Sequence, residues 1–179
     1  MMRYEDLYAR NAGYISADLQ DRIRRTRLLI AGCGLGSLAA ELALRTGFER
    51  FVLVDGDAVE AHNLNRQIYV ASDIGEPKVK ALARRLAAIN PSARIEECNF
   101  RVDSSNVAGL VERADLVIDT IDFLDLPAIL ALHDAARARG RTVISAFSVG
   151  RGTVAAVFTP TSATLRQMCG LPADGTVEE

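Results

Sequence analysis

A glycine-rich turn near the N-terminus constrains the fold more than any other feature of this chain. The apolar run Leu28–Ala31 stops at Gly32, and Gly34 and Gly36 follow at once. The next segment, Ser37–Arg45, is rich in alanine and leucine, which favour helices, and a glycine closes it. A strand, a glycine turn and a helix in this order predict a phosphate-binding loop, because glycine admits close approach and the helix start offers free N–H groups.

The rest of the chain repeats the alternation of strand and helix. A second apolar run, Phe51–Val54, ends in Asp55 and completes a βαβ unit. Further helices are expected at 78–89, 105–112 and 127–139, and further strands at 94–100, 116–119, 142–145 and 153–158. This alternation predicts an α/β fold with a Rossmann-like, doubly wound, mainly parallel sheet and helices on both faces. Its ligand is expected beyond the carboxyl ends of the strands.

Length and composition predict one folded domain. The chain has 179 residues, of which 49% are hydrophobic and 25% charged, the balance of an ordinary globular protein. We expect a nucleotide-binding domain over residues 1–158. Residues 159–179 show no periodicity and are expected to form an irregular tail or the start of a truncated region.

Charge, hydropathy and cysteine content limit location and partners. The formal net charge of −2 gives no global field that would gather nucleic acid, so a nucleic-acid partner is unlikely on this ground. No apolar run is long enough to cross a bilayer. Cys33, Cys98 and Cys169 are widely spaced and odd in number, which favours reduced thiols. These features predict a cytoplasmic protein without membrane contact.

The identity of the nucleotide depends on residues beyond the glycine turn. Asp55, at the end of the second strand, suits the hydroxyls of a ribose in either NAD or ATP. The third glycine comes one residue early for the dinucleotide pattern. The long polar loop 57–75 carries Arg66, and Lys78 follows it. An arginine fork and a lysine charge suit a triphosphate, and hydride transfer would not need them.

Four ordered motifs together resemble the ThiF/MoeB/HesA family of adenylyltransferases, which includes the E1-like ubiquitin-activating enzymes. They are GCGLGSLAAELALRTG, VLVDGDAVEAHNLNRQIY, DIGEPKVKALARRLAAINP and DLVIDTID, and the similarity spans about Tyr4 to Phe158. The resemblance implies that MgATP adenylates a C-terminal carboxylate, typically of a ubiquitin-like or sulfur-carrier protein ending in Gly-Gly, with release of pyrophosphate. The expected product is an acyl-adenylate.

The resemblance also implies a role for each matching residue. The expected nucleotide-binding residues are Gly32, Gly34 and Gly36 in the loop, Asp55 at the ribose, and Asn63, Arg66 and Lys78 at the phosphates. Asp122 would bind Mg²⁺. Arg10 matches an N-terminal arginine that reaches the triphosphate of a neighbouring subunit, which predicts a homodimer. The expected catalytic residues are therefore Arg10, Arg66, Lys78 and Asp122.

Several positions depart from the family pattern. Phe123 follows Asp122 where the family has asparagine, which removes a polar contact near the nucleotide. The paired CxxC motifs of many relatives are absent, so no structural zinc is expected. Cys169 lies where relatives may place a thiol that takes the acyl group, although no activating base is identifiable. Cys33 and Cys98 are interpreted as structural, and His62 and His133 as ordinary polar positions.

Two other functions remain open at this stage. The glycine loop and Asp55 also fit an NAD-dependent oxidoreductase, although no proton-transfer residue is evident. Phe123 fits a degenerate domain that binds nucleotide or a partner without turnover. The acyl substrate is also open: a sulfur carrier, a ubiquitin-like protein, a peptide or a carboxylate on modified tRNA, the last ranked below a protein carrier.

Overall fold

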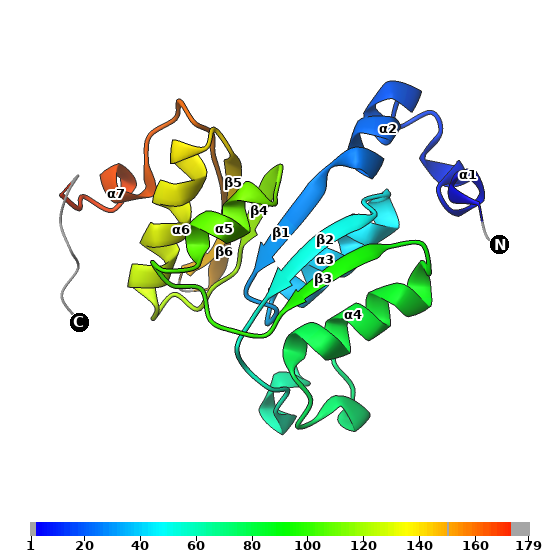
Figure 1. Cartoon of the computed structure of the whole chain (residues 1–179), viewed down its shortest axis with the longest axis horizontal. Coiled ribbons are helices and arrows are strands. Elements are labelled where there is room, and N and C mark those ends of the chain that lie inside the picture. The colour runs from blue at the N-terminus through cyan, green and yellow to red at the C-terminus, as the bar shows by residue number, and fades with distance from the viewer. Residues whose placement is uncertain (1–2, 150, 173–179) are drawn as a thin grey trace.

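Six strands form one sheet in the order β3-β2-β1-β4-β5-β6 (Figure 1). The computed structural model describes residues 3–149 and 151–172. The strands are β1 (Arg27–Ala31), β2 (Arg50–Val54), β3 (Arg94–Cys98), β4 (Leu116–Asp119), β5 (Thr142–Val149) and β6 (Gly152–Phe158). The first five are parallel, and β6 is antiparallel to β5. The predicted Rossmann-like, mainly parallel sheet is confirmed.

Helices connect the strands and flank the sheet. The α-helices are α1 (Tyr4–Leu7), α2 (Ala17–Arg25), α3 (Gly36–Thr46), α4 (Lys78–Ile89), α5 (Val107–Glu112), α6 (Leu126–Ala138) and α7 (Leu165–Met168). Three short 3₁₀ turns are η1 (Ala9–Asn11), η2 (Ala61–Asn63) and η3 (Ala71–Asp73). Within the described residues, no helix combines the length and the apolar character needed to span a membrane. A cytoplasmic location stays a prediction.

The sheet buries a separate apolar cluster on each face. Because successive side chains of a strand point to opposite faces, Leu29 and Val52 pack with α5 and α6. Leu28 and Phe51 pack with α3 and α4 on the other face. The continuous apolar runs seen in the sequence therefore have both faces covered, as parallel strands require. Helices on both faces are confirmed.

Some element boundaries differ from those expected. The fifth strand continues four residues past Ser145, because β5 and β6 pair as a hairpin from Val143 with Phe158 to Val149 with Gly152. The helix expected from residue 105 begins two residues later. The Asp103 side chain accepts hydrogen bonds from the backbone N–H groups of residues 105 and 106 and holds them in a turn.

The tail expected to be irregular contains one short helix. Thr164 caps α7 by accepting a hydrogen bond from Gln167 N at 3.1 Å. Leu165 is 3% exposed and joins the cluster beside α6. The expectation of a wholly irregular tail is therefore corrected over Leu165–Met168, because a buried leucine docks this turn. Residues 173–179 lie outside the described part, and the domain boundary at 158 stays a prediction.

Candidate functional site

A cavity of about 550 Å³ lies where the loops after β1, β2, β3 and β4 meet. Its volume is within the range typical of small-molecule sites. Among the residues predicted for the site, seven line it: Gly32, Gly34, Asp55, Asn63, Arg66, Lys78 and Asp122. The position beyond the carboxyl ends of the strands is the one expected for a doubly wound sheet.

The glycine loop is pressed against the segment that follows β4. Gly32 has a φ of 87°, and a Cβ there would lie 2.4 Å from the backbone oxygen of Thr120. A Cβ at Gly34 would lie 3.2 Å from Gln67 Nε2. Gly36 is not among the described residues that line the cavity. A Cβ there would lie 2.4 Å from the Thr120 hydroxyl, so the close packing of α3 also requires glycine at this position. The nucleotide contact of Gly36 stays a prediction.

Asp55 is held in place by the loops on either side of it. Its Oδ2 accepts a hydrogen bond from Cys33 N at 2.7 Å, and its Oδ1 accepts one from Asp57 N at 2.8 Å. The carboxylate therefore joins the end of β2 to the glycine loop. Each carboxylate oxygen has a further lone pair for a ligand hydroxyl, so the geometry is compatible with a ribose.

The long loop after β2 is ordered by contacts with the glycine loop and with α4. Tyr69 is 4% exposed, and its hydroxyl donates to Cys33 O at 2.6 Å. Burial raises the pKa of Tyr69, which keeps the hydroxyl protonated as a donor. Gly75 N donates to Val59 O at 2.8 Å and closes the loop on itself. The loop therefore forms an ordered wall of the cavity.

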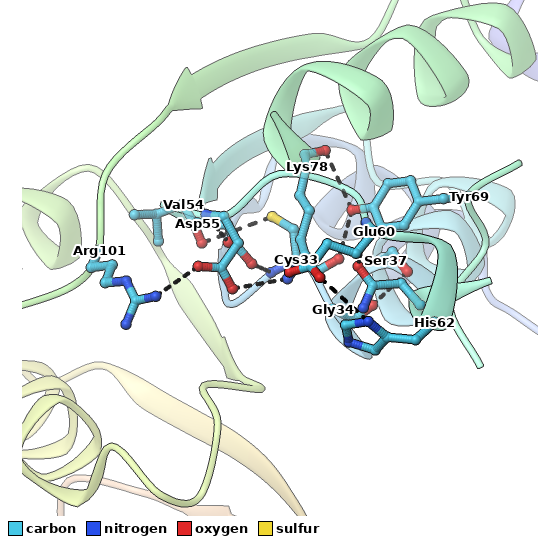
Figure 2. A network of polar contacts seen from close by, with 12 residues as sticks. Cys33, Gly34, Ser37, Val54, Asp55, Glu60, His62, Tyr69, Lys78 and Arg101 are labelled. Carbon is cyan, nitrogen blue, oxygen red and sulfur yellow. Dashed lines mark hydrogen bonds and ion pairs between the residues drawn. The ribbon is translucent and has the colours of Figure 1, made fainter. Parts of the chain in front are cut away.

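The predicted phosphate-binding side chains have partners of their own, and Figure 2 labels Lys78 among them. Lys78 is 7% exposed, and its Nζ lies 3.0 Å from Asp57 Oδ2. Arg66 donates through Nη1 to His62 O at 2.7 Å. Asn63 Oδ1 accepts from Glu60 N at 2.9 Å and thereby stabilises the η2 turn. Sequence reasoning placed these three residues together, and the structure brings them to one cavity.

Asp57 and Arg101 are cavity residues that the sequence analysis missed. Arg101 Nη2 donates to Asp57 Oδ1 at 2.8 Å, while Asp57 Oδ2 takes Lys78. Burial opposes ionisation of Asp57, but Lys78 and Arg101 outweigh it and lower its pKa. The sequence held a signal for Asp57, because a second carboxylate two residues after Asp55 lies at the same strand end. Arg101 had no such signal, because it follows a different strand.

A buried polar cluster supports the opposite wall of the cavity. Asp119, at the end of β4, is 3% exposed, and its Oδ2 lies 3.0 Å from His133 Nε2. Ser145 donates to the same oxygen at 2.9 Å. His133 Nε2 also lies 3.1 Å from Ser145 Oγ, so the three side chains form one buried polar network. His133 is therefore a buried member of this network, a contact that its interpretation as an ordinary polar position did not include.

The same aspartate shapes the segment that carries Asp122. Asp119 Oδ1 accepts from Ile121 N at 3.2 Å, which fixes the turn that follows the end of β4. Asp122 is exposed, and its Oδ1 accepts from Leu124 N at 3.1 Å. Phe123 is 68% exposed at the cavity rim. Across residues 3–149 and 151–172, no group of three or more His, Cys, Asp or Glu side chains could hold a metal ion.

Arg10 lies away from the cavity of its own chain. Its neighbour Asn11 donates through Nδ2 to Thr46 O at 3.0 Å, and Tyr4 donates to Gly47 O at 2.9 Å. Both acceptors lie at the end of α3 remote from the glycine loop. At 1.5 Å per residue, that helix of 11 residues is roughly 16 Å long. Arg10 is therefore remote from the cavity of its own chain, and its predicted role at the site of a neighbouring subunit stays a prediction.

The cysteines divide into two buried thiols and one exposed thiol. Cys33 and Cys98 are buried, in agreement with their structural interpretation, and burial raises the pKa of both. Cys169 is exposed and follows α7. His62 is also exposed, and its Nδ1 lies 3.4 Å from Glu60 Oε2.

The curated relatives of this chain include proteins named as adenylyltransferases. The sulfur carrier protein adenylyltransferase of Thermus thermophilus is 34% identical over 127 residues, which are 70% of this chain and 46% of the relative. The sulfur carrier protein ThiS adenylyltransferase of Escherichia coli is 32% identical over 148 residues, 82% of this chain and 58% of the relative. The chain thus spans about half the length of these curated relatives.

A solved structure shares the fold of this chain. The E. coli tRNA N6-threonylcarbamoyladenosine dehydratase, in complex with ATP, superposes with a TM-score of 0.75 at 28% identity, covering 79% of this chain and 58% of that one. The model of the ThiF family matches residues 8–178. With nearly the whole chain matched, this protein belongs to the ThiF family.

Proposed function

We propose that this chain is the nucleotide-binding domain of an ATP-dependent adenylyltransferase. Its reaction would activate the C-terminal carboxylate of a ubiquitin-like or sulfur-carrier protein as an acyl-adenylate and release pyrophosphate. The observation that carries the proposal is one cavity shared by the glycine turn, Asp55, Arg66, Lys78 and Asp122. The names of the relatives, which are sulfur-carrier and ThiS adenylyltransferases, support the substrate class.

The residues of the cavity fit the separate parts of ATP. Gly32 and Gly34 line the cavity just before α3, where phosphate would approach the backbone and the start of the helix. Asp55 is oriented by Cys33 N and Asp57 N and would accept from ribose hydroxyls. Arg66 and Lys78 would then hold the phosphates through charge-assisted hydrogen bonds. When the nucleotide is bound, Lys78 would therefore either leave Asp57 for a phosphate or contact both groups at once.

The charge of the cavity supports the need for a divalent cation. Three lining side chains are cationic, and the six carboxylates are those of Asp55, Asp57, Glu60, Asp119, Asp122 and Asp125. A triphosphate adds further negative charge to a lining that is already acidic. Mg²⁺ commonly binds through one or two carboxylates together with phosphate oxygens. Asp122, exposed at the rim, would hold the ion, which would offset phosphate charge.

The reaction needs no general base from this chain. A C-terminal carboxylate is already ionised near neutral pH, so it can attack phosphorus without losing a proton. Positioning and positive charge then supply the rate acceleration. In the proposal Arg66 and Lys78 are catalytic for this reason, and Arg10 acts on the neighbouring site of a homodimer. The exposed position of Arg10, remote from its own cavity, supports that arrangement.

The first test is ATP–pyrophosphate exchange with Mg²⁺ and a panel of Gly-Gly-terminated carrier proteins. The variants are Arg66→Ala and Asp122→Ala, and the control is Arg139→Ala, which removes an exposed arginine at the C-terminal end of α6. Exchange that requires a carrier, falls at least a hundredfold in both site variants and survives in the control supports adenylation. Exchange that survives in both site variants refutes their roles.

Other outcomes of the same test identify the remaining functions. If ATP binds and no carrier protein supports exchange, the chain acts as a nucleotide-binding partner domain, and modified tRNA is the next substrate to assay. If NAD binds and ATP does not, the oxidoreductase alternative holds and the adenylation proposal is wrong. Sedimentation analysis tests the homodimer, and exchange restored by mixing Arg10→Ala with Arg66→Ala subunits tests the contribution of Arg10 across subunits.

A further inference from the structure

Arg101 lines the cavity from the segment after β3, and not from the glycine loop or the long loop after β2. It is the third residue after β3, and it lines the cavity beside Val102. Its side chain is 75% exposed, yet one edge of the guanidinium is fixed by Asp57 Oδ1 at 2.8 Å (Figure 2). The group is therefore anchored on one side and open to a ligand on the other.

Gly56 makes room for this arrangement. A Cβ at Gly56 would lie 2.7 Å from Arg101 Cγ and 3.0 Å from Arg101 N. Real Cβ atoms do not approach that closely, so any larger residue would push the arginine away. The stem of Arg101 thus lies directly against the residue between Asp55 and Asp57. In the proposed function, this is the place where the ribose is held.

The apolar part of the cavity lies next to the same arginine. Val102 is 8% exposed and Ile129 is 2% exposed, and both line the cavity together with Ile121 and Phe123. The phosphate-binding groups Arg66 and Lys78 come from a different loop, after β2. The side chains after β3 therefore border the nucleoside end of the cavity, where an aromatic base would be buried.

We propose that Arg101 contacts the nucleoside of bound ATP, with its guanidinium, anchored by Asp57, covering one face of the adenine. This inference rests on the proposed function and adds a residue that determines nucleoside affinity. A planar guanidinium stacks on an aromatic face, whereas the compact ammonium of lysine lacks that planar surface. Arg101 thus acts on the base, and Arg66 and Lys78 act on the phosphates.

Titration calorimetry with ATP, AMP and tripolyphosphate tests the assignment, each at fixed Mg²⁺ and salt. The proteins are the wild type, Arg101→Ala, Arg101→Lys and the control Arg139→Ala. We expect Arg101→Ala to weaken ATP and AMP by a similar factor of about 5 to 30. Arg101→Lys should recover less than half of that loss in binding free energy, because it restores charge without a planar group. Tripolyphosphate affinity should stay within about twofold of wild type, since Arg66 and Lys78, and not Arg101, would hold the phosphates.

Each alternative result would overturn either the contact between Arg101 and the base or the proposed function itself. Equal weakening of tripolyphosphate and ATP, with full recovery in Arg101→Lys, makes Arg101 a phosphate ligand and overturns the base contact. Unchanged ATP and AMP affinity in Arg101→Ala overturns the inference while the proposed function stands. If the wild type binds no ATP, the proposed function fails and the inference fails with it. Thermal unfolding of each variant, expected to match the wild type for this exposed side chain, excludes a folding defect.

Discussion

The two walls of the cavity are built in different ways. The N-terminal wall, residues 32–78, contains the glycine loop and the long loop after β2, and its key side chains are buried or tied to one another. Tyr69 and Lys78, for example, are 4% and 7% exposed. The C-terminal wall, residues 119–129, has a buried anchor in Asp119 but an open rim, where Phe123 is 68% exposed and Leu124 is 91% exposed.

This difference separates the tasks of the two walls. Hydrogen bonds between the glycine loop, Asp55 and Tyr69 fix the first wall before any ligand arrives. Such preorganisation favours binding of a charged ligand, because the protein loses little further entropy. The second wall fixes only its base, through His133 and Ser145. Variants in each wall can therefore separate the two tasks.

Gly32→Ala should have the largest effect, because Gly32 is where the two walls touch. The new Cβ would meet the Thr120 backbone oxygen at 2.4 Å, in a backbone with φ of 87°. We expect a loss of about 2 to 4 kcal/mol in unfolding free energy, measured by chemical denaturation. Gly109→Ala is the matched control, since nothing lies within 4 Å of its Cβ in α5 and alanine favours a helix. Equal stability of the two variants would contradict the contact.

Ser145→Ala tests the buried anchor of the C-terminal wall. It removes a hydroxyl that is 1% exposed and donates to the Asp119 carboxylate at 2.9 Å. Hydrogen bonds to buried charged groups contribute about 1.5 to 3 kcal/mol, and we expect a loss of that size. The exposed Ser72→Ala should change the unfolding free energy by less than about 0.5 kcal/mol. A neutral Ser145→Ala would mean that His133 alone holds Asp119.

Tyr69→Phe tests the tie between the two loops of the N-terminal wall. The variant keeps the ring and leaves Cys33 O without its 2.6 Å donor. We expect a loss of about 1 to 2 kcal/mol in unfolding free energy, and faster hydrogen exchange over residues 57–75. Tyr14→Phe, at a site 93% exposed, is the control and should be neutral. Unchanged exchange in that loop would show that the hydroxyl does not hold it.

Phe123→Asn should have the smallest effect on stability, because it changes an exposed rim residue. We expect the unfolding free energy to stay within about 0.5 kcal/mol of wild type. ATP affinity, measured by calorimetry, should rise severalfold, since the amide restores a polar contact beside Asp122. Leu124→Asn is the control on the same rim, because Leu124 is not among the described cavity-lining residues. If ATP affinity rose in both variants, the gain would come from a more polar rim in general and not from a specific contact at residue 123.

Local features of the sequence determined the fold class and part of the site. The strand before Gly32, the helix after it and Asp55 at the end of β2 are each set by neighbouring residues. Helix and strand periodicity depends on short-range sterics and burial, so the order of elements could be predicted. The family motifs added Asn63, Arg66, Lys78 and Asp122, which line one cavity. The roles of Asp122 with Mg²⁺ and of Arg10 in a homodimer stay predictions.

Only the tertiary structure decided which side chains meet across the sheet. Asp57 joins Lys78, 21 residues away, and Arg101, 44 residues away. Asp119 joins His133 and Ser145 from two later elements. No local pattern indicates such contacts, because they depend on the register of parallel strands separated by helices. The sequence by itself thus specified the glycine loop. Packing of the sheet then created the charged and buried networks that hold the two walls of the cavity.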